Sequence, residues 1–369
     1  MLRYITFLIL VTCMMSCSSR EIEDETKNFS DFIQDTEFIA AKKVIALDDT
    51  DTGIYRPLDI VVDKKGRAIV ADASNWSLHL LSGEGETISK AGIIGRGPEE
   101  FLGINQLEID DDQKLTVVDK RSQRFSEFFV TDDSLVYNNS FAMPNYSSLV
   151  LETIQKTETL GNFGVFRTPN LSMDNNTTFE VHQLDSDYQI TEKVFEIPGN
   201  ETMMLGNYPE DHVFGFKSDW VTLGDTFYYA RSNQLNFKSY NLSNGDSLEY
   251  EVSDVPKNQK SSEDEKFLIN HLRPILQSYP SVKDEIEERE ILPQFLSFIA
   301  GENYGYFTIF NMSNNSDTIL MVEKETEEMK AIEVPPIFNL YAVYENEDDH
   351  FLYGVDHTND NNQILIIQL

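Results

Sequence analysis

The chain has 369 residues, of which 63 are Asp or Glu and 29 are Lys or Arg, so its formal net charge at pH 7 is -34. A surface this acidic repels phosphate backbones and anionic lipid headgroups, which argues against nucleic acid as a partner. The acidity is explained by solubility, with a specific cationic ligand as the alternative. The length is sufficient for one large hydrophobic core.

Residues 1–17 have the pattern of a secretory signal, because Arg3 precedes an apolar run that is too short to span a bilayer as a mature helix. The chain contains two cysteines, Cys13 and Cys17. The triplet Met15-Ser16-Cys17 resembles the lipobox of bacterial lipoprotein signals, although Met14 stands where that family prefers Leu. The resemblance implies cleavage before Cys17 and lipidation of that residue. Lipidation of Cys13 and an ordinary cleaved signal are the alternatives.

Residues 18–35 are polar and acidic, which predicts a flexible tether between the lipid and a domain over residues 36–369. Glu21, Glu23, Asp24 and Glu25 resemble the signal that exports Bacteroidetes lipoproteins to the outer face of the outer membrane. That resemblance implies a lipid-anchored protein at the cell surface. The periplasmic leaflet is the alternative.

Short apolar strands recur in the chain at a period typical of propeller blades. We expect blade one over 54–94, blade two over 103–142, blade three over 145–199, blade four over 213–256 and blade five over 293–336. Only the first two copies align residue by residue. A shift of 47 residues places Asp63 on Asp110, Gly66 on Gln113, Asp72 on Asp119 and Leu78 on Phe125.

The last blade is expected to combine both ends of the chain. Residues 338–344, 350–355 and 362–369 predict three strands, one short of a four-stranded sheet. The strand-like segment 37–47 supplies the fourth, which would close the ring without an open edge. The sequence therefore predicts an all-β, six-bladed β-propeller of four-stranded antiparallel blades.

Residues 257–291 interrupt the strand rhythm. Ser262 with Glu265 predicts a capping box, and Phe267, Leu268 and Leu272 recur at helical spacing. Pro274 should kink or end this helix, and Ser281 can start a second one. We expect a helical insertion over one face, acting as a cap on an apolar rim or, alternatively, as a functional lid.

The motif GRGPEEF, followed by strands that end in Asp110 and Asp119, is similar to the NHL-type propeller repeat. Combined with the lipobox, the chain looks like the six-bladed, TolB-like propeller lipoproteins of Bacteroidetes. The resemblance implies the fold and the cellular location but no mechanism. Gln113 stands where the repeat has a turn glycine. The residues assigned to the inter-blade loop are Gly95, Gly97, Pro98 and Phe101. A phosphate cradle is the alternative for this loop, but a strand follows it where a helix is needed.

Ligands of propellers usually meet the mouth of the central channel, near the ends of the strands closest to the axis. Trp76 beside an Arg could stack on a sugar ring, which makes a glycan ligand an option, or it could cover a blade edge. The predicted binding residues in the first two blades are Arg56, Asp59, Trp76, Asn105, Gln106, Arg121 and Arg124.

No cofactor or metal site is predicted. No pair of the six histidines combines ligand spacing with a carboxylate on one helix, and the acidic turns at 48–51 and 110–112 do not fit an EF-hand. Neither a Gly-x-Ser-x-Gly elbow nor a free cysteine nucleophile is present in the mature sequence. Three triplets resemble the O-glycosylation signal of Bacteroidetes, with Ser134, Ser247 and Thr318 as candidate acceptors and plain turn residues as the alternative.

These observations predict a lipid-anchored outer-membrane propeller that binds a protein or glycan partner without catalysis. The competing hypothesis is a propeller enzyme, a lyase or hydrolase with residues from several blades at the channel. A cluster of His, Arg and carboxylates around the axis would favour the enzyme.

Overall fold

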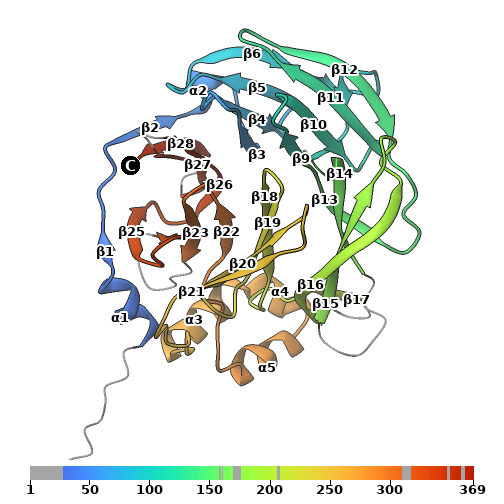
Figure 1. Ribbon diagram of the computed structural model, residues 1–369. Helices are drawn as coiled ribbons and strands as arrows, with labels where there is room; N and C mark the ends of the chain where they lie inside the picture. Colours follow the sequence, from blue (N-terminus) through green and yellow to red (C-terminus); the bar gives the residue numbers. More distant parts are fainter. Residues whose placement is uncertain are drawn as a thin grey trace, which may run out of the picture.

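The computed structural model of the protein describes residues 28–157, 159, 161–168, 176–205, 208–309, 317–346, 350–358 and 362–369. Their strands form six sheets of four or five strands, arranged around one axis (Figure 1). The predicted six-bladed β-propeller is confirmed. The predicted signal and Cys17 lie outside the described residues.

Each blade is an antiparallel meander that runs from the axis outward. Blade one contains β3 (Pro57–Val62), β4 (Ala68–Asp72), β5 (Ser77–Leu81) and β6 (Thr87–Ala91). Blade two contains β9 (Ile104–Ile109), β10 (Lys114–Asp119), β11 (Arg124–Val130) and β12 (Leu135–Ala142). Blade four contains β18 (Ser218–Leu223), β19 (Thr226–Arg231), β20 (Asn236–Asn241) and β21 (Ser247–Glu251).

Blades three and five each carry a fifth strand. Blade three contains β13 (Val150–Thr157), β14 (Gly161–Arg167), β15 (Asn176–Leu184), β16 (Ile190–Leu205) and β17 (Tyr208–Asp211). Blade five contains β22 (Ser297–Ala300), β23 (Tyr304–Ile309), β24 (Asp317–Glu323) and β25 (Met329–Val334), with β1 (Glu37–Phe38) at its outer edge. Blade three therefore extends beyond the boundary expected at residue 199, because β16 continues into a hairpin with β17.

The ring closes as predicted, with a strand from the N-terminal part of the chain. Strand β2 (Lys43–Leu47) pairs antiparallel with β28 (Gln363–Gln368), next to β27 (His350–Asp356) and β26 (Phe338–Glu345). Only the second half of the expected segment 37–47 takes part. Its first half, β1, pairs in parallel with β25 and covers the edge of blade five.

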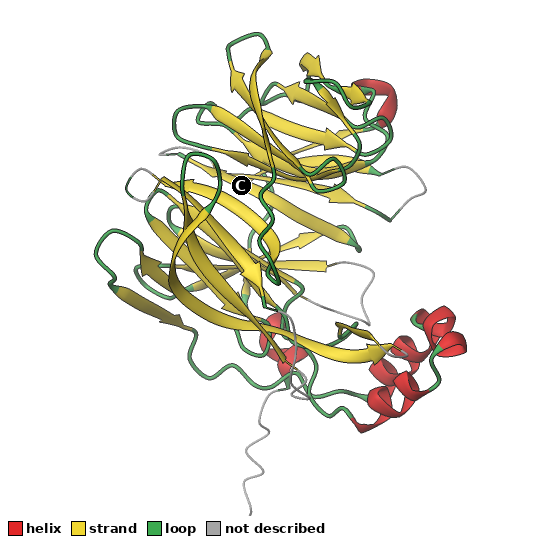
Figure 2. Ribbon diagram, turned by 90° about the vertical axis from the view of Figure 1, so that its right-hand side faces the viewer, coloured by secondary structure: helices red, strands yellow, loops and turns green. Residues whose placement is uncertain are grey.

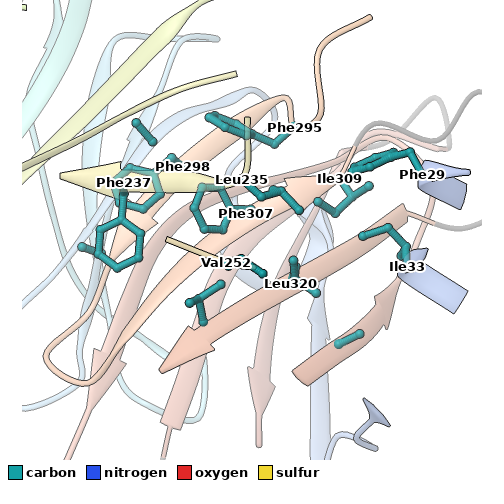
Figure 3. Close-up of a cluster of buried hydrophobic side chains, with 14 residues drawn as sticks. Phe29, Ile33, Leu235, Phe237, Val252, Phe295, Phe298, Phe307, Ile309 and Leu320 are labelled. Atoms are coloured by element: carbon teal, nitrogen blue, oxygen red, sulfur yellow. The ribbon is translucent and has the colours of Figure 1, made fainter. Parts of the chain in front are cut away.

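Burial follows the position of a strand within its blade. Every residue of β4 and β5 is buried, since both faces of these middle strands lie against neighbouring blades. The outermost strands β6 and β21 contain only exposed and half-buried residues. Apolar clusters accordingly fill the spaces between blades, such as the one around Phe237, Phe298 and Phe307 between blades four and five (Figure 3).

The expected flexible tether does not extend to residue 35. Residues 29–34 form helix α1 (Phe29–Gln34), which begins at Asn28, whose side chain accepts a hydrogen bond from the Asp31 amide. Phe29 and Ile33 are buried against Ile309 and Leu320 of blade five (Figure 3). This burial fixes the segment, so the folded domain begins before residue 36.

The predicted helical insertion is present as α3 (Ser262–His271), α4 (Arg273–Ser278) and α5 (Ser281–Glu288), which lie outside the stacked sheets (Figure 2). A capping box starts α3, but its partners are Ser261 and Asp264, one residue before the predicted pair. Pro274 lies in the first turn of α4, where its missing N–H costs nothing. A separate short helix, α2 (Asp49–Thr52), leads into blade one. No helix in the described part of the chain is long and apolar enough to cross a membrane.

Candidate functional site

The candidate site lies on one face of the ring, which we call the top face. Because each blade is an antiparallel meander, this face carries the connections from one blade to the next and those between the second and third strands of a blade. Arg56, Trp76, Arg121 and the helical insertion all belong to such connections. The innermost strands β3, β9, β13, β18, β22 and β26 surround the axis (Figure 1).

Two of the predicted binding residues, Asp59 and Gln106, join neighbouring blades. Asp59 Oδ2 accepts a hydrogen bond from the Leu107 amide at 2.7 Å, and Gln106 binds both the amide (3.1 Å) and the carbonyl (3.0 Å) of Ile154. Their polar atoms are thus occupied within the protein, which favours a structural role over ligand binding.

Asp219 forms the equivalent hydrogen bond between blades four and five, since its Oδ2 accepts from the Phe298 amide at 3.0 Å. Burial raises the pKa of Asp59 and that of Asp219 to about 6. The pKa of Glu108 is also raised, first by burial and then by the nearby carboxylates of Asp59 and Asp110. These groups form a titratable layer at the innermost strands.

A β-bulge interrupts the innermost strand in each of the first three blades. The bulged residues are Leu58, Asn105 and Glu152, which are separated by the 47-residue period of the sequence. A bulge bends its strand and redirects a side chain away from the regular pleat. Leu58 and Asn105 are exposed here, while Glu152 Oε1 accepts from Arg167 Nε at 2.6 Å.

The glycine-rich connection between blades one and two is held from several sides. Gly97 donates its amide to Glu100 Oε2 at 2.6 Å, and a side chain at Gly95 would collide with the same carboxylate at 2.1 Å. Phe101 is fully buried between the two blades. Arg124, a predicted binding residue, instead donates to the Gly97 carbonyl at 2.8 Å and contacts that of Glu100. A phosphate cradle is disfavoured because the Gly97 amide is already bound.

Trp76 packs on the core between blades one and two with a left-handed backbone (φ 54°). This placement favours its role as a blade cover over sugar stacking. Asn105 Oδ1 accepts from the Lys120 amide at 2.8 Å. Arg56 and Arg121 are exposed, and neither guanidinium forms an ion pair or hydrogen bond within the described part of the chain.

Two buried aspartates that the sequence placed at strand ends fix the top-face connections. Asp72 accepts from the amides of Arg56 (3.0 Å) and Ser74 (2.9 Å). Asp119, one period later, accepts from the amides of Leu102 and Ser122, each at 2.8 Å. Both carboxylates are fully buried and fully used.

Sequence reasoning missed the charged network under the helical insertion. Arg289 pairs with Glu201 of β16 and lies 4.9 Å from the ring centre of Phe216. His212 is 2.9 Å from Glu285 of α5, and burial, then Arg289 and Lys217, lowers the His212 pKa to about 4. Neutral His212 therefore donates from Nε2, while its Nδ1 accepts from the Phe214 amide. No local motif could reveal these pairs, because the partners lie far apart in the sequence.

A group of exposed apolar residues at the starts of the innermost strands was also missed. Leu58 is 37% exposed in β3, Val150 is 53% exposed at the first position of β13, and Leu296 is 47% exposed before β22. Tyr55 before β3 and Ile337 before β26 are exposed as well. We call these five residues the apolar ring. The apolar ring could have been found from the sequence, because its members are apolar residues at strand starts, where a polar residue would be expected.

The remaining candidate chemistry is dispersed. None of the six histidines lies on an innermost strand, and the described residues contain no group of three or more metal-ligating side chains. Among the candidate glycosylation sites, Ser247 is exposed at the start of β21, and Ser134 lies half-buried in the turn before β12. Thr318 is 7% exposed inside β24, so a transferase could not reach it in the folded protein.

A family model described as a 6-bladed beta-propeller matches residues 18–353, and the chain belongs to that family. No curated protein matches the sequence. Among solved structures, a protein from Bacteroides fragilis NCTC 9343 that is described as exported is 12% identical, with a TM-score of 0.52 over 89% of this chain and 94% of the other. Virginiamycin B lyase from Staphylococcus aureus is 11% identical, with a TM-score of 0.46 over 89% and 99%. These similarities concern the fold alone.

Proposed function

We propose that the protein is a lipid-anchored, exported propeller that binds a protein partner through its top face without catalysis. The observation that carries this proposal is the apolar ring, with members from blades one, three, five and six around the axis. Protein interfaces combine exposed apolar side chains at their centre with Arg at the contact. Arg56 and Arg121 supply the latter.

A protein partner is favoured over a glycan because the aromatic residue suited to sugar stacking, Trp76, is packed on the blade core. A non-catalytic role is favoured over a lyase or hydrolase by two observations. The histidines lie away from the innermost strands, and the polar groups of Asp59, Gln106 and Asp219 are bound to neighbouring blades.

The proposed cellular location is the cell-surface leaflet of the outer membrane, as in the NHL/TolB-like lipoproteins of Bacteroidetes. It rests on the Met15-Ser16-Cys17 triplet and the acidic residues that follow it. The description of one structural relative as exported agrees with it. Labelling of intact cells with a membrane-impermeant amine reagent tests the leaflet, and Cys17→Ala should release the protein from the membrane fraction.

Crosslinking in intact cells, followed by affinity purification and mass spectrometry, tests the binding role. We expect one protein partner in near-equal amount. The combined variant Leu58→Gln, Val150→Thr and Leu296→Gln should reduce its recovery at least tenfold. The matched control carries Leu248→Gln and Val136→Thr, which change exposed apolar residues on the outermost strands β21 and β12. Equal loss in both variants, or none in either, would contradict binding through the top face.

A further inference from the structure

The charge of the top face near the axis differs from that of the whole protein. The chain has a net charge of -34, yet basic residues surround the innermost strands of blades one to three. Two aspartates of this region, Asp72 and Asp119, are fully buried, and their carboxylates accept hydrogen bonds from backbone amides. They contribute no exposed carboxylate at this place.

The basic residues of this region fall into two groups. Arg167 is fully engaged, because it binds Glu152 at 2.6 Å and both carboxylate oxygens of Asp211 at 2.6 and 3.2 Å. Arg56 and Arg121 are exposed and have no ion-pair partner in the described ranges. An exposed Arg without a partner keeps its five donors for a ligand.

Lys120 belongs with the second group. Its Nζ has one long contact, 3.4 Å to the carbonyl of Glu152, and no carboxylate of the described chain lies within ion-pair distance. Burial lowers its pKa, and Arg167 adds to this effect against the attraction of Glu152. An anion beside Lys120 would compensate for the lost hydration of the ammonium group.

Local contacts bring Lys120 and Arg121 together at the start of β9, and Arg56 lies at the corresponding position of the neighbouring blade one. The Lys120 amide is bound to Asn105, the bulged residue of β9, and Lys120 Nζ reaches across to blade three. The next residue, Arg121, lies over the start of β9, since a methyl group added to Gly103 would be 3.1 Å from its Cβ. Arg56 occupies in blade one the position that Gly103 occupies in blade two, 47 residues later.

We infer that Arg56, Lys120 and Arg121 bind the carboxylates of an acidic segment on the protein partner, while Leu58 and Val150 contact its apolar side chains. The inference rests on the proposed binding function and names the chemistry of the partner. Arg is suited to this task because its planar guanidinium binds a carboxylate with two parallel hydrogen bonds. The surrounding negative charge repels acidic chains that do not reach these three groups, which adds selectivity.

The test uses the purified chain and a fluorescent peptide of alternating Glu and Leu, with binding followed by anisotropy. We expect the double variant Arg56→Gln and Arg121→Gln to weaken binding at least tenfold, and a Gln-Leu peptide to bind the wild type equally weakly. The matched control, Lys42→Gln with Arg273→Gln, changes exposed basic residues on the rim and on α4 and should bind like the wild type. Thermal unfolding verifies that all variants are folded.

Three results would overturn the inference: no binding of the Glu-Leu peptide to the wild type, undiminished binding by the double variant, or preference for a sulfated glycan over the peptide. Crosslinking in cells separates this failure from that of the proposed function. If the apolar-ring variant loses the partner but the arginine variant retains it, the top face binds a partner that is not acidic. If both variants retain it, the proposed function fails as well.

Discussion

The connection from blade one to blade two and the connection from blade three to blade four join equivalent strands by different chemistry. The first is short, glycine-rich and held by backbone hydrogen bonds to Asp119, with Phe101 buried below it. The second extends into the β16–β17 hairpin and is held by Arg167, Arg289 and the apolar face of the helical insertion. The short connection therefore belongs to the core of the ring, whereas the long one forms a separate layer outside it.

The largest expected effect comes from removing the buried phenyl group of Phe101 in the short connection. Phe101→Ala should lower the free energy of unfolding by about 3–5 kcal/mol, because it leaves a cavity between two blades. Urea denaturation measures it. Phe129→Ala, at a side chain of the next blade that is 45% exposed, is the control and should cost less than half as much. Equal losses would mean that the connection is not part of the ring's core.

In the long connection, Ile286→Ala should act locally. Ile286 of α5 is fully buried in a cluster with Met203 of the hairpin and Leu268 of α3, so about 2–4 kcal/mol of packing is lost there. Hydrogen exchange followed by mass spectrometry should show faster exchange over 257–291 and unchanged exchange in β4 and β10. Phe267→Ala, at an exposed position of α3, is the control. Faster exchange throughout the ring would show that the two layers unfold together.

Asp119→Asn tests the backbone hydrogen bonds of the short connection. The two amides bind different oxygens of Asp119, and Asn keeps only one oxygen, so one of them loses its acceptor and we expect a loss of about 1–3 kcal/mol. The exposed Asp187→Asn should change stability little. A shift of the thermal midpoint that is the same for both variants would contradict the role of Asp119.

The smallest effect concerns pH. The raised pKa of Asp59 means that the folded protein holds this proton more tightly than the unfolded chain, so stability falls as the pH rises from about 4 to about 6. Asp59→Asn keeps an oxygen for the Leu107 amide, as the neutral Gln106 does for Ile154, and gives up only the local contact of the other oxygen with the Ile60 amide. We expect this variant to lose that part of the pH dependence and to gain about 1–2 kcal/mol above pH 6. Denaturation at pH 4, 5, 6 and 7 measures both, and parallel pH profiles of the two proteins would contradict the assignment.

The same contrast explains what could be predicted from the sequence. The turn with Asp63 and Gly66 recurs with Asp110 and Gln113, and both copies have the same backbone hydrogen bonds. Gln113 (φ 60°) is left-handed like Gly66 (φ 72°) in blade one. Such signals are local, so the blades and the helical insertion could be predicted, and the ring closure followed because the three C-terminal strands were one short of a four-stranded blade.

The candidate site was less accessible to prediction because it depends on neighbours that are distant in the chain. The positions of Asp59 and Gln106 near the axis were anticipated, but not that their side chains bind the next blade. The pair of Glu201 and Arg289 has no spacing that a sequence pattern could reveal. The burial of Phe29 and Ile33 depends on blade five, which the composition of residues 18–35 does not indicate.

Because β2 pairs with β28, the ring of blades cannot close until almost the whole chain is available. These strands come from opposite ends of the described residues, so the loop that their contact closes contains every other blade. Until β28 is in place, β2 and β27 each present an unpaired edge to which another chain could add. Escape from aggregation then depends on how fast the final strand arrives, and a loss of β28 should lower solubility.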